Sequence, residues 1–211
     1  IGGYVSYESD NHQITTIFFS RQNRDSLLAR YRFDSIPFAP MNIDTKDLKT
    51  TAHEKDLIEM RQDAVERIST NPDGFFTFYE NTSFNPIPLI RGKERKVFIL
   101  TGPTVSNVVI IGNDYLLEYN KRNKLKKKVK IHKSMLQFPN RADDPENKLE
   151  STYHSHVVSK YINSTDICTL LLYKSYVEWK QHYVISKKYV SIFDMENESL
   201  VIITTKAWEN N

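Results

Sequence analysis

Two histidines separated by one residue, with an aspartate further along the chain, form the arrangement best suited to chemistry in this 211-residue sequence. His154 and His156 stand at the end of a predicted strand, where alternate side chains point the same way, so both imidazoles can reach one ion. Asp166, in the first turn of the next predicted helix, can add a carboxylate. This set, with one position left for water, comes close to the ligands of catalytic zinc. Such an ion lowers the pKa of its water and polarises a carbonyl oxygen.

The same residues have simpler interpretations. An H-x-H pair on a strand is more often exposed or hydrogen-bonded than metal-binding, and an aspartate in a first helical turn often compensates the helix dipole. Asn163 or Ser164 could donate a hydrogen bond to an oxyanion, or serve only as the helix N-cap. These alternatives stay open at the level of the sequence.

The segment Tyr153-His154-Ser155-His156, followed by Asp166 at the start of an apolar helix, resembles the JAMM motif of the JAB/MPN metalloproteases, H-[ST]-H-x7-S-x-x-D. The resemblance covers about residues 46–205 and is specific only over 152–190. It implies that His154, His156 and Asp166 bind one zinc ion, with water at the fourth position. It also implies a peptidase or isopeptidase in which zinc-bound water attacks an amide carbonyl, so that the partner is a protein or peptide substrate.

Two departures from the family pattern matter. The spacing from His156 to Asp166 is one residue short, which puts Asn163 where the family has serine and Ser164 one position late. In Asn71-Pro72-Asp73-Gly74, asparagine stands where active members carry the general-base glutamate of E-x-x-G. Loss of such a base costs a factor of roughly 10² to 10⁴ in rate. The alternative function is therefore a catalytically inactive JAB-like binding or scaffold module.

The resemblance also implies the architecture that would position this site. The expectation is an α/β fold, with a mixed β-sheet flanked by helices and related to cytidine deaminase. Residues 1–45 are predicted to form an N-terminal β extension and residues 46–211 the JAB/MPN-like metallohydrolase domain.

Local patterns predict the individual elements. Thr51 and Glu54 form a capping box that opens a helix, which ends at the turn signal of residues 71–74. A second, mostly apolar helix is predicted from Asp166 to about Trp179, and an extended stretch over Ile36–Pro40. Strands are predicted at residues 4–7, 13–19, 75–79, 96–100, 108–111, 115–119, 151–156, 182–186, 190–193 and 200–203.

Basic residues gather in one segment of the chain. Residues 121–133 hold eight lysines and arginines, and without them the net charge of +3 would become 3 − 8 = −5. Leu125, Val129 and Ile131 have the spacing of one face of a strand, with lysines on the other. A solvated edge strand is therefore favoured over a nucleic-acid surface. An unrelated adhesin-like or nucleic-acid-binding β-rich domain is a third possibility, and it depends on this lysine strand alone.

Composition limits the remaining classes. The single cysteine, Cys168, excludes an internal disulfide and is predicted to be a buried thiol; no apolar run is long enough to span a membrane. The start without methionine favours an exported bacterial domain, periplasmic or secreted, although a truncated start explains it equally well. An isoelectric point of about 8.8 without disulfides also fits a cytoplasmic protein. The oligomeric state is not defined. His12, His53 and His132 have no partners in the sequence. His182 precedes a predicted strand and could support a metal ligand, although an ordinary structural role is favoured.

Overall fold

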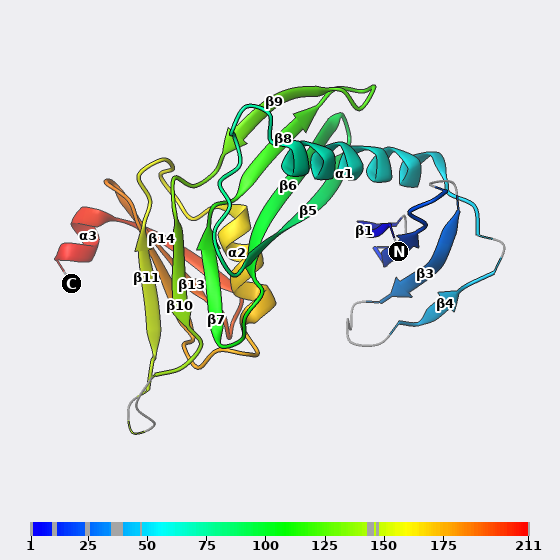
Figure 1. Ribbon diagram of the computed structural model, residues 1–211. Helices are drawn as coiled ribbons and strands as arrows, with labels where there is room; N and C mark the ends of the chain where they lie inside the picture. The colour runs from blue at the N-terminus through cyan, green and yellow to red at the C-terminus, as the bar shows by residue number, and fades with distance from the viewer. Residues whose placement is uncertain are drawn as a thin grey trace. The chain divides into compact units, whose positions relative to one another are not determined.

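The computed structural model describes residues 2–9, 12–23, 26–34, 40–46, 48–142, 146 and 148–210 (Figure 1). Strands hold 45% of these residues and helices 17%. The predicted α/β fold, with one mixed sheet flanked by helices, is therefore wrong: the chain is mainly β and its strands form four small sheets. Most strand pairings among the described residues are antiparallel, and antiparallel neighbours need no crossover helix between them. The cytidine deaminase-like JAB/MPN architecture is not supported.

The first sheet is built from the N-terminal strands, in the order β1-β2-β3-β4, with antiparallel neighbours. Its alternating pattern buries one face, which includes Val5, Ile17 and Phe19. The predicted stretch Ile36–Pro40 lies, except for Pro40, outside the described residues. The strands are β1 (Gly3–Glu8), β2 (Ile14–Phe19), β3 (Leu27–Phe33) and β4 (Asn42–Asp44).

The second sheet has the order β5-β6-β8-β9. Its edge strand β5 was missed at the sequence level because it contains Pro86 and Pro88, which an edge strand tolerates and a central strand does not. The strand predicted at residues 75–79 does not form: the amide of Thr77 donates to the Tyr115 hydroxyl (2.8 Å) rather than to a strand. The strands are β5 (Thr82–Arg91), β6 (Glu94–Pro103), β8 (Tyr115–Tyr119) and β9 (Leu125–Lys130).

The two remaining sheets carry the C-terminal half. One pairs β10 with β7, and the other has the order β11-β12-β13-β14, in which β11 and β12 run parallel. The strands are β7 (Val108–Gly112), β10 (Met135–Pro139), β11 (Ser151–Ser155), β12 (Gln181–Ile185), β13 (Tyr189–Asp194) and β14 (Ser199–Thr204).

The first helix has the predicted limits, and the second does not. α1 (Ala52–Thr70) begins with the Thr51 capping box and ends at Asn71, whose φ of 37° is left-handed. α2 (Ser164–Tyr173) ends well before Trp179, because the following residues bond to the chain after β10: the amide of Glu178 donates to the Asn140 carbonyl (2.8 Å). Cys168, on α2, is exposed rather than buried.

A short third helix, α3 (Thr205–Glu209), follows β14. Among the described residues, no helix combines the length and apolar character that crossing a membrane requires.

The chain divides into two compact units. Unit 1 comprises residues 1–76, 86–99 and 116–129; unit 2 comprises residues 77–85, 100–115 and 130–211. In unit 2, α2 packs against β7 and contributes to an apolar core. Its buried members are Val109, Ile111, Ile162, Leu170, Trp179, Val184, Phe193 and Met195.

In unit 1, the turn between β8 and β9 is fastened to α1 by Asn123. Its side-chain amide donates to Asp56 (2.8 Å) and Glu59 (2.6 Å) and accepts from Arg95 (2.7 Å), and its φ is 54°. We expect Asn123→Gly to lower the free energy of unfolding by about 2 kcal/mol, because buried polar partners lose their bonds. Asn123→Ala should cost about 1 kcal/mol more, since alanine is strained at positive φ. Urea unfolding measures both.

The exposed neighbour Arg122 supplies the control for this prediction, and Arg122→Ala should leave stability within about 0.5 kcal/mol of wild type. Equal stability of Asn123→Gly and the wild type would show that the side-chain bonds contribute nothing.

Candidate metal centre

His154 and His156 lie at the C-terminal end of β11, in unit 2. The parallel pairing of β11 with β12 continues beyond the strand, because the amide of His156 donates to the Ile185 carbonyl (2.8 Å). Both side chains therefore leave the same face, and their ring centroids are 4.7 Å apart. Both residues are buried.

Asp166 occupies the first turn of α2. One carboxylate oxygen, Oδ2, accepts the backbone amide of Asn163 (2.8 Å) in a capping arrangement, which fixes the side chain toward the helix start. The same oxygen lies 3.3 Å from Nε2 of His156, and the side chain is fully buried. The structure thus brings together the three residues that the sequence singles out as metal ligands.

A fourth residue, His132, joins them, although the sequence analysis assigns it no partner. Gly112 has a φ of 102°, and any Cβ there would lie 2.3 Å from the Ser134 carbonyl oxygen. This close approach allows the amide of Asn113 to donate to Ser134 (3.0 Å) and that of Ile131 to Asp114 (2.9 Å). His132 is held between these two bonds, with its ring turned inward.

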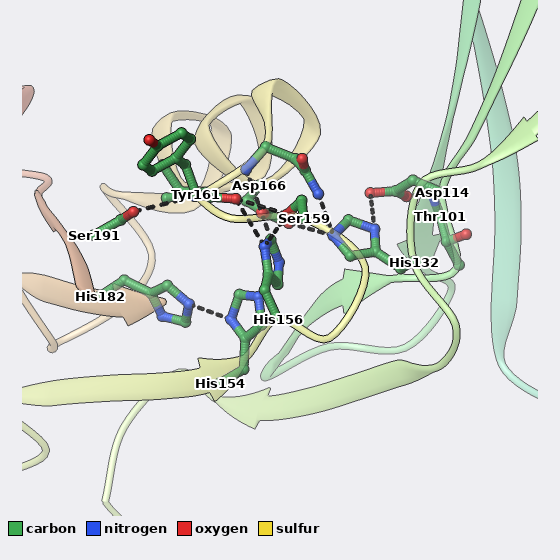
Figure 2. A network of polar contacts seen from close by, with 12 residues as sticks. Thr101, Asp114, His132, His154, His156, Ser159, Tyr161, Asp166, His182 and Ser191 are labelled. Carbon is green, nitrogen blue, oxygen red and sulfur yellow. Dashed lines mark hydrogen bonds and ion pairs between the residues drawn. The ribbon is translucent and has the colours of Figure 1, made fainter. Parts of the chain in front are cut away.

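The four side chains converge on one point (Figure 2). Nε2 of His132 lies 2.9 Å from Oδ1 of Asp166, and one potential ligand atom from each of the four residues lies within 4.8 Å of all the others. This buried cluster of His132, His154, His156 and Asp166 could hold a metal ion.

In His154, His156 and Asp166 an outward atom is hydrogen-bonded and an inward atom is not, whereas in His132 the outward Nδ1 is the unbonded atom. Nδ1 of His156 contacts the Ser159 hydroxyl (2.6 Å) and the Tyr161 carbonyl (2.9 Å). Among the described residues, no hydrogen-bond partner is found for Nε2 of His154, Nε2 of His156 or Oδ1 of Asp166. Buried polar atoms are rarely left unbonded. A cation would satisfy all three.

A second imidazole supports His154 from behind. Nδ1 of His154 lies 2.7 Å from Nε2 of His182, and Nδ1 of His182 lies 2.7 Å from the Thr152 hydroxyl (Figure 2 shows the His154–His182 contact). If Nε2 of His154 binds a cation, its Nδ1 must carry the proton and donate to His182. His182 then donates from Nδ1 to Thr152. Outer partners of this kind fix the tautomer and ring orientation of metal-binding histidines.

The electrostatics of the cluster differ from residue to residue. Burial lowers the pKa of His154 to about 4 and that of His182 to about 3, so both are neutral at pH 7. Burial alone would also lower the pKa of His132, but Asp114 and Asp166 outweigh it and raise this pKa to about 9. Although burial opposes it, His132 and His156 lower the pKa of Asp166 far below its usual range. The carboxylate is therefore ionised and available as a ligand.

The two candidates for oxyanion stabilisation are placed differently. The side-chain nitrogen of Asn163 lies 3.3 Å from Nε2 of His132, so this amide reaches the cluster. Ser164 is the first residue of α2 and is exposed to solvent. Of the two, the structure brings only Asn163 to the metal-ligand residues.

The polar side chains of the segment that corresponds to E-x-x-G are engaged within unit 1. The side-chain amide of Asn71 is occupied by the backbone of Phe76, donating to its carbonyl (2.9 Å) and accepting from its amide (3.0 Å). Asp73 forms an ion pair with Lys128. These four residues belong to unit 1, whereas the cluster belongs to unit 2.

A small cavity of about 40 Å³ opens on the cluster. It is lined on one side by the segment from Ile131 to Ser134 with Leu136, and on the other by residues 154–159. The side chains of Val157 and Val158 are exposed beside it. The cavity exceeds the space that one water molecule needs.

Comparison of the chain with protein families, characterised proteins and solved structures gave no match. The assignment of a metal centre therefore depends on the geometry of the cluster itself.

Replacing His182 tests the support of His154. Phenylalanine keeps the aromatic ring beside Phe138 (5.5 Å) and Trp179 (5.8 Å) but cannot accept the His154 proton. We expect His182→Phe to weaken metal binding roughly 10- to 100-fold, as loss of an outer partner does elsewhere. Titration with zinc against a competing fluorescent chelator measures the change. His12→Phe, at an exposed histidine of unit 1, should bind zinc as the wild type does, and equal affinities for all three proteins would contradict the role of His182.

Proposed function

We propose that this protein is a zinc-dependent hydrolase of amide bonds, a peptidase or isopeptidase, with zinc held by His154, His156 and Asp166. One observation carries the proposal: Nε2 of His154 and Nε2 of His156 are buried in the cluster without hydrogen-bond partners among the described residues, while Nδ1 of each ring has one. A site arranged only for stability would pair its inward polar atoms with hydrogen-bond partners, because unbonded buried polar atoms are costly.

The donor set favours zinc. Two imidazole nitrogens and one carboxylate oxygen match the ligands of catalytic zinc sites, whereas magnesium and calcium prefer oxygen alone. Zinc bound there would lower the pKa of a water molecule and polarise a carbonyl oxygen. The resemblance of His154-Ser155-His156 and Asp166 to the JAMM motif supports an amide as the substrate.

The chain's own groups would do the remaining work. His182 and Thr152 would hold His154 in the tautomer that exposes Nε2. The Asn163 amide, close to the cluster, would donate a hydrogen bond to an oxyanion that develops on the substrate. The cavity of about 40 Å³ is too small for a peptide segment, so residues 131–134 or 155–159 would have to separate before a substrate amide reaches the metal.

Hydrolysis assays test this proposal. Protein treated with chelator, and then supplied with zinc, is incubated with a set of peptides and of lysine-isopeptide substrates, and cleavage is followed by mass spectrometry. We expect cleavage that disappears with chelator, returns with zinc, and is absent in Asp166→Asn. The exposed Glu196→Gln variant is the matched control and should cleave normally.

The alternative is a catalytically inactive module that binds metal and a protein partner. Asn71 favours it, since this residue occupies the position of the general base in the resembled family and its amide is engaged by Phe76. Zinc bound at one ion per chain without cleavage of any substrate in the set would favour the inactive module over the hydrolase.

A further inference from the structure

We propose that His132 is a further protein ligand of the metal, oriented by Asp114, so that three imidazoles and one carboxylate surround the ion. This inference rests on the proposed metal centre and goes beyond the ligand set that the JAMM resemblance implies. It concerns the segment 131–134, which joins β9 to β10.

The position of His132 is set by the backbone. The bonds from Ile131 to Asp114 and from Asn113 to Ser134 hold the segment on both sides of it. The His132 side chain is only 8% exposed, so its ring is enclosed rather than free to turn into solvent. A buried imidazole that is already placed loses little conformational freedom on binding a metal.

His132 has a carboxylate on each side of its ring. Nδ1 faces outward and lies 3.5 Å from Oδ2 of Asp114, without a hydrogen bond, while Nε2 faces the cluster, 2.9 Å from Oδ1 of Asp166 and 3.3 Å from the side-chain nitrogen of Asn163. An amide donor beside Nε2 is compatible with a lone pair on that nitrogen. A carboxylate behind the other ring nitrogen is one of the supports that metal-binding histidines use.

Asp114 is itself fixed in place behind His132. It is 2% exposed, and its other oxygen, Oδ1, accepts the Thr101 amide (2.9 Å). A buried carboxylate held in this way can keep the His132 ring oriented toward the cluster.

A fourth protein ligand changes what the site can do. Four protein ligands fill a tetrahedral zinc shell, whereas catalytic sites keep one position open. An external ligand can then enter only if the coordination expands or His132 withdraws. The segment 131–134 would thereby control access to the metal.

X-ray absorption at the zinc edge tests the proposal directly, because the outer-shell scattering of imidazole rings can be counted. We expect three imidazoles in zinc-loaded wild type and two in His132→Ala. Zinc affinity should fall in His132→Ala by more than the roughly 10- to 100-fold that loss of an outer partner costs, and by that smaller factor in Asp114→Asn. Lys133→Ala, at the exposed neighbour, is the control.

Azide binding to the cobalt-substituted protein supplies a second measurement. Visible absorption should change little when azide is added to wild type and markedly when it is added to His132→Ala, in which a position is open. Two imidazoles in zinc-loaded wild type would overturn the role of His132 and leave the proposed function intact. Wild type that binds no zinc would overturn both. The number of imidazoles in zinc-loaded wild type tests the proposal even if His132→Ala does not fold.

Discussion

Replacing both His154 and His156 with alanine is expected to abolish metal binding. Both Nε2 atoms face the cluster without hydrogen-bond partners among the described residues, so each replacement removes a ligand. Wild type purified without added metal or chelator should contain about one zinc ion per chain by mass spectrometry, and the double variant less than about a tenth of that.

Loss of metal binding should also abolish the rise in Tm that zinc produces. Free zinc at 100 times its dissociation constant stabilises a folded protein by about 2.7 kcal/mol, which corresponds to roughly 5–10 °C in Tm for a chain of this length. We expect this rise for wild type and none for the double variant. The control removes the same number of histidines elsewhere, as His12→Ala with His53→Ala, both exposed residues of unit 1. A double variant that keeps its zinc and its Tm rise would refute the metal centre.

The metal-free protein is expected to be most stable near pH 6.5 and to lose stability steeply in acid. His154 and His182 have pKa values lowered to about 4 and about 3, so below pH 6.5 the unfolded chain takes up protons that the folded chain does not. Each contributes a loss of up to about 1.4 kcal/mol per pH unit. His132 acts in the opposite direction, because its raised pKa of about 9 gives stability that is lost as pH rises from 6.5 through 9.

Urea unfolding in the presence of chelator, at intervals between pH 5 and pH 9, measures this profile. The acid limb is analysed above pH 5, where aspartates and glutamates remain ionised. His182→Phe should show roughly half the acid slope, since one of the two neutral buried histidines is gone. An acid limb that is flat from pH 6.5 to 5 in the wild type would contradict the buried neutral state of this pair.

Elements with local signals could be predicted from the sequence. α1 begins at a capping box and ends at a left-handed asparagine, and both signals lie within the helix ends themselves. α2 was predicted too long because its last predicted turn is replaced by bonds to Pro139 and Asn140, which lie far away in sequence. β5 was missed because its prolines are tolerated only at an edge, and edge position is a tertiary property.

The candidate site likewise contains residues that local patterns predict and residues that only tertiary contacts bring into it. His154 and His156 are related by the two-residue repeat of a strand, and Asp166 by its place in a first helical turn, so local periodicity predicts all three. His132 and His182 reach the cluster through strand pairing: His182 lies beside Thr152 in the parallel β11–β12 register, and His132 depends on the close approach at Gly112. No spacing in the sequence encodes either contact. The glycine and the turn Asn113-Asp114 were the signals available for His132.

The small cavity over the buried cluster has a consequence for kinetics. A cavity of about 40 Å³ has room for an ion and little else, and a multidentate chelator is far larger. Removal of a bound ion would therefore wait for residues 131–134 or 155–159 to separate, a local opening with its own rate. The rate of metal loss should then reach a plateau as chelator concentration rises, and this plateau reports how often the segments part. A centre that held its ion in this way would retain it during periods when the concentration of free zinc is low.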